Sequence, residues 1–412
     1  MNNVQGAIRR TDLDWVRIGA FLILILYHVG VVYAPGPNAV GSFSPRPLPW
    51  LVVPMTLVNP WRLLVLFVVS GAATRFMSDK MSPRALLRSR SARLLIPFIF
   101  GVWVVVPPQC FVQAVERCGY SDDYLQFWQG YLVADQHLCT NGPHFVVPTP
   151  NHLWFVGYLW VLTALLALML AIAPHLLVKL QRWIDLALAG RGLFIWPACW
   201  LALAYAVLQR GFPFWYGFAI YVPAFLFGFL VATSNSVWQR FAGVRWQALA
   251  GAAFSYCALI GLALAVLGTP STWAAKVTSS SFSAAHLVLH TLGSAVYGIN
   301  QWLWMAVVFG FAYQHLRGRD GPIRRYLTDA IFPFYIIHQT TIEVVAHYLS
   351  EERLALGLEA TLLICVTVVS CFATYEIARR FRPLRPLFGL KGTDVPGLPL
   401  APLSSVAFTD TH

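Results

Sequence analysis

Long apolar stretches, separated by short polar or Pro- and Gly-rich breaks, recur along the whole chain. A helix that crosses a membrane needs about 20 mostly apolar residues, and the pattern predicts an all-α polytopic membrane protein with about ten transmembrane helices. We expect residues 1–391 to form one integral-membrane domain and the Pro-rich residues 392–412 to form a loosely ordered tail. The predicted membrane-spanning segments are 15–33, 57–76, 94–114, 152–173, 193–209, 215–233, 247–267, 295–314, 330–349 and 357–378.

The composition supports a membrane protein. Of the 412 residues, 58% are hydrophobic and only 11% are charged, whereas a soluble domain has about 45–50% apolar and about 25% charged residues. A globule of this composition would lack the polar surface that keeps a protein dissolved. Soluble enzymes, disulfide-rich secreted scaffolds, disordered chains and nucleic-acid binders are therefore excluded as classes.

The basic residues fall mainly on one side of the predicted bundle. The chain has 29 Lys and Arg against 17 Asp and Glu, which gives a net charge of +12. Most of the basic residues lie before the first segment, in alternate loops and after the last segment, so the positive-inside rule predicts that both termini are cytoplasmic. Topology accounts for the charge. The expected partner is the lipid bilayer, and no nucleic acid is needed.

The longest predicted outer segment, 115–151, contains Cys118 and Cys139. Disulfides persist on that side of the membrane, but sequence spacing alone leaves a bridge between these two residues open. His286 and His290 have the i,i+4 spacing of a metal pair on a helix, yet no third ligand accompanies them. We therefore expect no metal site.

Polar side chains inside apolar helices are the candidates for function, because each is costly in lipid. Arg17 and His28 lie eleven residues apart in the first segment. This spacing places them on one helix face, about 16 Å apart along the axis. An anion bound at Arg17 would therefore point toward His28. The alternative is that Arg17 reaches the lipid headgroups and His28 hydrogen-bonds within the bundle.

Further candidates lie at both ends of the predicted helices. Arg75, Arg90 and Arg93 are on the cytoplasmic side, and the last two share a helix face on which two guanidiniums would suit a phosphate. An ordinary charged loop is the alternative interpretation of these residues. The candidates in the outer half are Arg62, Asn151, His152, Trp154, Tyr335, His338 and Glu343.

Several short motifs resemble, in their order and spacing, those of the membrane acyltransferase-3 family. They are Arg17 and His28 with ten residues between them, residues 67–71 ending in Ser-Gly, Arg90 and Arg93 before Leu-Leu-Ile-Pro, and residues 333–338. Residues 151–155 and 382–391 are most similar to the glucan succinyltransferase branch of that family. The chain departs from many polysaccharide-acetylating relatives because residues 151–160 contain no glutamate.

The resemblance implies a multi-pass protein of the bacterial inner membrane that acylates a hydroxyl on the outer face. The donor would be cytoplasmic acyl-CoA, and the acceptor a glycan or another sugar-containing molecule. Arg17, Arg75, Arg90 and Arg93 would bind the phosphates of the donor, and His28 would be the general base. The outer-half candidates would bind the acceptor or stabilise the oxyanion.

Acyl-CoA would be a substrate and not a tightly bound cofactor. Acetyl-CoA and succinyl-CoA both remain open as donors. A succinyl group would need an additional cation near the thioester, and Arg62 is the outer-half residue that offers one.

A proton-coupled secondary transporter is the alternative function. His28, His338 and Glu343 would then form a proton relay within the membrane. Transporters often consist of two related halves, and we find no such repeat in this sequence. The acyltransferase is therefore the favoured function, and the sequence predicts no oligomeric state.

Overall fold

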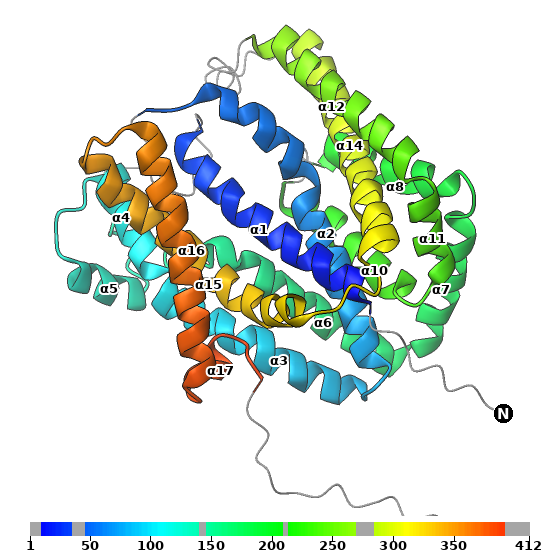
Figure 1. Cartoon of the computed structure of the whole chain (residues 1–412), viewed down its shortest axis with the longest axis horizontal. Coiled ribbons are helices and arrows are strands. Elements are labelled where there is room, and N and C mark those ends of the chain that lie inside the picture. Colours follow the sequence, from blue (N-terminus) through cyan, green and yellow to red (C-terminus); the bar gives the residue numbers. More distant parts are fainter. Residues whose placement is uncertain (1–9, 35–45, 140–145, 209–212, 269–283, 392–412) are drawn as a thin grey trace, which may run out of the picture.

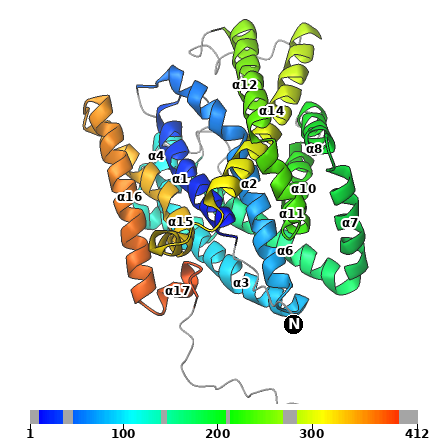
Figure 2. The ribbon, with the colours of Figure 1, turned by 45° about the vertical axis from the view of Figure 1, so that its right-hand side comes forward.

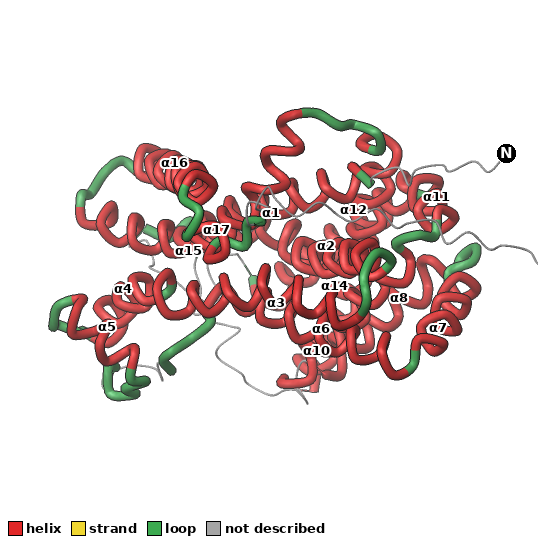
Figure 3. The backbone as a smooth tube through the Cα atoms, turned by 90° about the horizontal axis from the view of Figure 1, so that it is seen from below, coloured by secondary structure: helices red, strands yellow, loops and turns green. Residues whose placement is uncertain are grey.

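The computed structural model describes residues 10–34, 46–139, 146–208, 213–268 and 284–391. Figure 1 shows a bundle of long helices, and within the described ranges the chain forms helices and loops but no strand (Figure 3). The all-α prediction is confirmed, whereas the predicted tail, 392–412, lies outside the described residues. The helices are α1 (Thr11–Tyr33), α2 (Val52–Ser78), α3 (Pro83–Phe100), α4 (Pro107–Cys118), α5 (Tyr124–Leu132), α6 (Trp154–Ile172), α7 (Pro174–Ala187), α8 (Gly192–Leu203), α10 (Pro213–Val231), α11 (Asn235–Gly243), α12 (Arg245–Leu267), α14 (Ala284–Leu316), α15 (Pro322–Glu351), α16 (Leu356–Arg380) and the short α17 (Leu384–Leu387).

All the predicted membrane-spanning segments fall on helices, but their number differs from the prediction. In the described part of the chain, seven helical stretches are long and apolar enough to cross a membrane, and nine if each of two bent pairs forms one span. The bends are 108° between α7 and α8 and 110° between α10 and α11. Helix α15 is not among the seven, because ionisable and amide side chains interrupt its apolar surface. The count of about ten is therefore not confirmed.

Helix α1 lies in the middle of the bundle (Figures 1 and 2). It packs against α2, α14 and α15, so it has neighbours on several sides. A helix in this position is expected to be apolar around most of its circumference, as the sequence of α1 is. Around this centre, α10 packs on α2, α12 on α14, α16 on α15, and α3 along α6.

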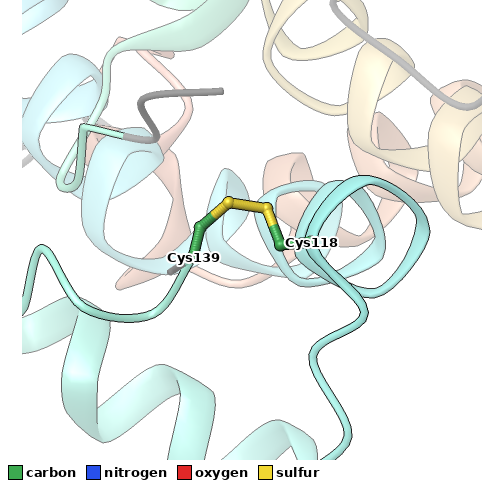
Figure 4. Close-up of a disulfide and its surroundings, with 2 residues drawn as sticks. All are labelled: Cys118 and Cys139. Carbon is green, nitrogen blue, oxygen red and sulfur yellow. A yellow bond between two sulfur atoms is a disulfide. The ribbon is translucent and has the colours of Figure 1, made fainter. Parts of the chain in front are cut away.

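The outer segment between α4 and α6 is tied to the bundle. A disulfide joins Cys118, at the end of α4, to Cys139 (Figure 4), with the two Cα atoms 5.3 Å apart. The hydroxyl of Tyr131 on α5 donates a hydrogen bond of 3.0 Å to the carbonyl of Val102 and lies 3.2 Å from the carbonyl of Thr149. These contacts fix the chain immediately before α6, where several predicted site residues lie. The pairing that the sequence left open is present.

Helices α2 and α10 approach each other closely through two glycines. A Cβ atom on Gly71 would lie 2.0 Å from the carbonyl oxygen of Phe225, and one on Gly228 would lie 1.9 Å from the carbonyl oxygen of Val68. Small residues at such crossings let two backbones come into contact in a membrane. Gly71, which ends the Ser-Gly motif, thus lets α2 pack directly on the backbone of α10.

We predict that Gly71→Ala destabilises the protein, because the new methyl group would collide with the backbone of α10. Overpacking of this kind typically costs about 1–3 kcal/mol, which a lower melting temperature in detergent would report. The matched control is Gly261→Ala on α12, where an added Cβ meets no atom within 4 Å. That change should stay within about 0.5 kcal/mol. Equal melting temperatures for the two variants would contradict the prediction.

Candidate functional site

Arg17 and His28 both face α15, as their spacing predicts. The Nη2 atom of Arg17 donates a hydrogen bond of 2.8 Å to the carbonyl oxygen of Thr328. The ring centroid of His28 lies 5.3 Å from that of His338. Eleven residues on α1 thus span nearly the same length as ten residues on α15, so the two helices run side by side in the same direction between these contacts.

A cavity of about 830 Å³ lies at the end of the bundle where α1 begins and α16 ends. Residues from α1, α2, α3, α15, α16 and the segment around α17 line it, and basic side chains outnumber carboxylates among them. We call it the cation cavity. Its charged lining residues are Arg10, Arg17, Lys80, Arg90, Arg93, Arg379, Arg385 and Lys391, together with Asp14 and Asp329.

Two predicted phosphate ligands are held at this cavity by backbone oxygens. Arg90 donates to the carbonyl of Ser70, at 3.3 Å, and to the hydroxyl of Thr74. Arg93 donates from Nε to the carbonyl oxygen of Gly389, at 3.4 Å. Gly389 has φ +67°, and a Cβ there would lie 2.5 Å from the ring of Phe332. Glycine at this position therefore lets the segment after α17 fold back onto α3.

A buried ion pair fixes the start of α15 to α1 beside the cavity. The side chain of Arg324 is 1% exposed and pairs with Asp14 and, at 2.8 Å, with Asp320. Hydrogen bonds from Arg324 and then Arg325 hold the pKa of Asp320 well below its usual range. Because two carboxylates neutralise Arg324, this arginine serves the packing of the two helices.

Three histidines from separate elements meet in the other half of the bundle. The ring centroid of His338 on α15 lies 5.3 Å from those of both His28 on α1 and His152 before α6. His152 and His338 are buried, whereas His28 is half-buried. The ring of Tyr335 lies 5.7 Å from His338, and its hydroxyl donates to the carbonyl of His152. We call His28, His152 and His338 the histidine cluster.

Four buried aromatic rings lie between the cation cavity and the histidine cluster. Phe21 lies between Arg17 and His28 on α1, and Tyr335 lies between Thr328 and His338 on α15. Ring centroids are 5.4 Å apart for Phe21 and Tyr335, and 6.0 Å apart for Phe155 and Tyr335. Phe67 contacts Phe155 at 4.8 Å. We call Phe21, Phe67, Phe155 and Tyr335 the aromatic layer.

Arg62 lies beside the histidine cluster in an unusual environment. Its side chain is 6% exposed, and its guanidinium carbon lies 3.3 Å from the ring centroid of Tyr27, the residue before His28. Nη1 donates a hydrogen bond of 2.9 Å to Asn59. Within the described ranges, Nε has no hydrogen-bond partner and no carboxylate pairs with the side chain. A buried arginine without an anion is costly in a membrane, so Arg62 is suited to bind one.

Not every predicted residue lies at these sites. Arg75 does not line the cation cavity and instead pairs with Asp79, at 3.0 Å. Trp154 packs among aromatic rings away from the histidines. Asn151 has φ +42° and turns the chain into His152.

Glu343 is buried a little more than one turn beyond His338 on α15. It accepts hydrogen bonds from Gln339, at 2.5 Å, and from Gln113 on α4, at 2.6 Å. Gln339 and Glu343 are thus a pair at the i,i+4 spacing of a helix. The side chains of His286 and His290 lie outside the described residues, and no group of three or more possible metal ligands occurs among those described.

Five basic residues that line the cation cavity were not among the predicted site residues. Their sequence positions predicted only cytoplasmic loop charges, because their loops are far apart in sequence and only the fold brings them together. Within the sequence, the similarity of residues 382–391 to relatives was the one indication that this end carries function. The missed residues are Arg10, Lys80, Arg379, Arg385 and Lys391.

Comparison with known proteins gives one family and a set of relatives. The acyltransferase domain family matches residues 10–376. Two relatives are named Glucans biosynthesis protein C, one from Shigella boydii serotype 4 (strain Sb227) and one from Escherichia coli O81 (strain ED1a). Each is 23% identical to the chain over 404 residues, which covers 94% of this chain and 96% of the relative. No solved structure matches the chain significantly.

Proposed function

This chain belongs to the acyltransferase-3 family, and on that basis we propose that it moves an acyl group from acyl-CoA to a hydroxyl of a sugar-containing acceptor. The observation that carries the proposal is the alignment of two sites along α1 and α15. A strongly basic cavity lies at one end, and a cluster of histidines lies about 16 Å farther along the helices. This spacing suits a donor whose charged end and reacting end are far apart.

The cation cavity is the proposed binding site for the phosphates of the donor. Arginine offers planar pairs of donors that match phosphate oxygens, and Arg17, Arg90 and Arg93 all line the cavity. The contacts of Arg90 and Arg93 are with backbone carbonyls and one hydroxyl. None of these groups is negatively charged, so these two guanidiniums keep their positive charge for an anionic ligand.

His28 is the proposed general base. A sugar hydroxyl is a weak nucleophile at neutral pH and needs a base within hydrogen-bonding distance. His28 would take the hydroxyl proton as the oxygen attacks the thioester carbonyl. The C–O bond forms, the C–S bond breaks, and the leaving thiolate takes the proton from His28. The products are an ester and free CoA.

The topology proposed for this reaction follows from the distribution of charge. The cation cavity lies where the basic ends of α1, α3 and α16 meet, and the positive-inside rule assigns that end to the cytoplasm. The donor would then enter from the cytoplasm and the acceptor from the opposite side. The inner membrane of a bacterium is the compartment that fits both.

Arg62 suggests which acyl groups are accepted. It lies against Tyr27, next to the proposed base, and lacks a carboxylate partner among the described residues. A succinyl group ends in a carboxylate that would pair with this guanidinium, whereas an acetyl group would leave it unpaired. We therefore propose succinyl-CoA as the preferred donor, with acetyl-CoA as the alternative.

The first prediction from this proposed function concerns the general base, His28. Wild-type protein purified in detergent should release CoA from acetyl-CoA or succinyl-CoA when a glucan acceptor is present. His28→Ala should lower the turnover by at least about 10²-fold, the usual contribution of general-base catalysis. Its melting temperature should stay close to that of the wild type. Turnover by His28→Ala near the wild-type value would contradict the assignment.

The second prediction concerns the cation cavity. Arg90→Ala and Arg93→Ala should each weaken the binding of acyl-CoA about tenfold or more, since a charge-assisted hydrogen bond contributes about 1.5–3 kcal/mol. Turnover at saturating donor should change less. Arg88→Ala is the matched control, because Arg88 lies on the same helix but does not line the cavity. Unchanged affinity in a titration of both cavity variants would exclude them as phosphate ligands.

The third prediction concerns donor selectivity. Arg62→Gln should lower kcat/KM for succinyl-CoA about 10- to 100-fold, the effect of losing one charge-assisted hydrogen bond. The value for acetyl-CoA should change little, so this donor serves as the internal control for folding. An equal loss with both donors would show that Arg62 only supports the packing of α1 on α2.

A further inference from the structure

In two rings of the histidine cluster, a backbone carbonyl determines which imidazole nitrogen carries the proton. The Nδ1 atom of His338 lies 2.7 Å from the carbonyl oxygen of Tyr335. A carbonyl oxygen only accepts hydrogen bonds, so Nδ1 must carry the proton. In the neutral ring, Nε2 is then an acceptor, and it has no partner in the described part of the structure although His338 is fully buried.

His152 is fixed in the complementary way. Its Nε2 atom lies 3.0 Å from the carbonyl oxygen of Ile336, so Nε2 carries the proton and Nδ1 is bare. Two bare acceptors cannot form a hydrogen bond with each other. Although the rings of His152 and His338 are in contact, the neutral pair therefore leaves Nε2 of His338 available to another donor.

The ring that can supply this donor is His28. Its centroid lies 5.3 Å from that of His338, although as the rings stand no nitrogen of His28 is hydrogen-bonded to Nε2 of His338. If the two ring nitrogens turn toward each other at that separation, they come within about 3 Å, the length of a hydrogen bond. The other rings against His338 are His152 and Tyr335. The Tyr335 hydroxyl is already donated to the carbonyl of His152.

We propose that His338 is a positioning residue that sets the tautomer of His28 by accepting its N–H at Nε2. The inference rests on the proposed acyl transfer and adds a residue to that site. Because Nε2 of His338 only accepts, His28 must donate, and the second nitrogen of His28 is then bare and faces away from His338. This bare nitrogen is the one that can take a proton from a substrate hydroxyl.

This series of hydrogen bonds is similar to that of a catalytic base that a buried hydrogen-bond acceptor orients. The carbonyl of Tyr335 accepts from Nδ1 of His338, Nε2 of His338 accepts from His28, and His28 accepts from the substrate hydroxyl. During transfer, the hydroxyl proton moves to His28 and then to the leaving thiolate. His338 keeps its own proton, and its hydrogen bond stabilises the imidazolium that forms on His28.

The proposal gives His338 a different role from the one expected from the sequence. His338 was a candidate donor to the oxyanion. A neutral ring whose N–H is given to the Tyr335 carbonyl has no second proton for an oxyanion. Its remaining nitrogen suits an acceptor role next to His28.

The test compares substitutions at position 338 by whether they can accept a hydrogen bond. His338→Leu and His338→Phe have no acceptor, whereas the side-chain carbonyl of His338→Gln has one. We expect kcat to fall about 10²-fold or more in His338→Leu and His338→Phe, within the range for general-base catalysis. In His338→Gln, kcat should be about tenfold higher than in those two variants. KM for the acyl-CoA donor should stay unchanged, because the cation cavity lies beyond the aromatic layer.

The matched control is His347→Gln, on the same helix but outside the cluster, where His347 pairs with Glu116 at 2.7 Å. It should retain wild-type kcat. The positioning role would be overturned if His338→Leu and His338→Phe folded and had the same kcat as His338→Gln. It would also be overturned if His338→Gln had the same melting temperature as the other two variants and an equally low kcat. Wild-type protein that releases no CoA from either donor would overturn the proposed function itself, which is a separate outcome.

Discussion

The pairing of α1 with α15 is the contact on which the arrangement of both sites depends. Arg17 binds the backbone of α15 at Thr328, and His28 meets His338 about the same distance farther along. The buried Arg324, held by Asp14 and Asp320, fixes the starts of the two helices relative to each other. A shift by one residue would rotate a side chain by about 100° around its helix. The register of this one helix pair therefore decides whether the cavity and the histidines share an axis.

Backbone carbonyls hold several polar side chains of the candidate sites. Arg17 and Arg90 donate to Thr328 and Ser70, and His152 and His338 are bound at Ile336 and Tyr335. A carbonyl offers an acceptor at a fixed place without adding a negative charge. The guanidinium of Arg90 is thus fixed in place by a contact that does not neutralise it. Arg324 is the contrast, since its two carboxylates neutralise it.

The spacing of residues along the sequence predicted the features that depend on a single helix. The other features of the sites depend on tertiary packing. The common face of Arg17 and His28 and the pair Gln339–Glu343 follow from helical geometry, and both are observed. The sequence could not show that the segment with basic residues after α16 packs against α3 at Arg93, because that depends on the turn at Gly389. The count of spans differed for two reasons. Polar side chains interrupt the apolar surface of α15, and α8 and α10 qualify only together with their bent neighbours α7 and α11.

The aromatic layer packs between the cation cavity and the histidine cluster, so both sites depend on the same four rings. Its four rings come from α1, α2, α6 and α15 and pack against one another between the cavity and the histidines. The layer lies between a basic cavity and the histidine cluster. Under the proposed function, a donor arm that reaches His28 would displace at least part of this packing. Because Tyr335 belongs to the layer and its carbonyl also orients His338, opening of the layer and alignment of the proposed base involve the same turn of α15.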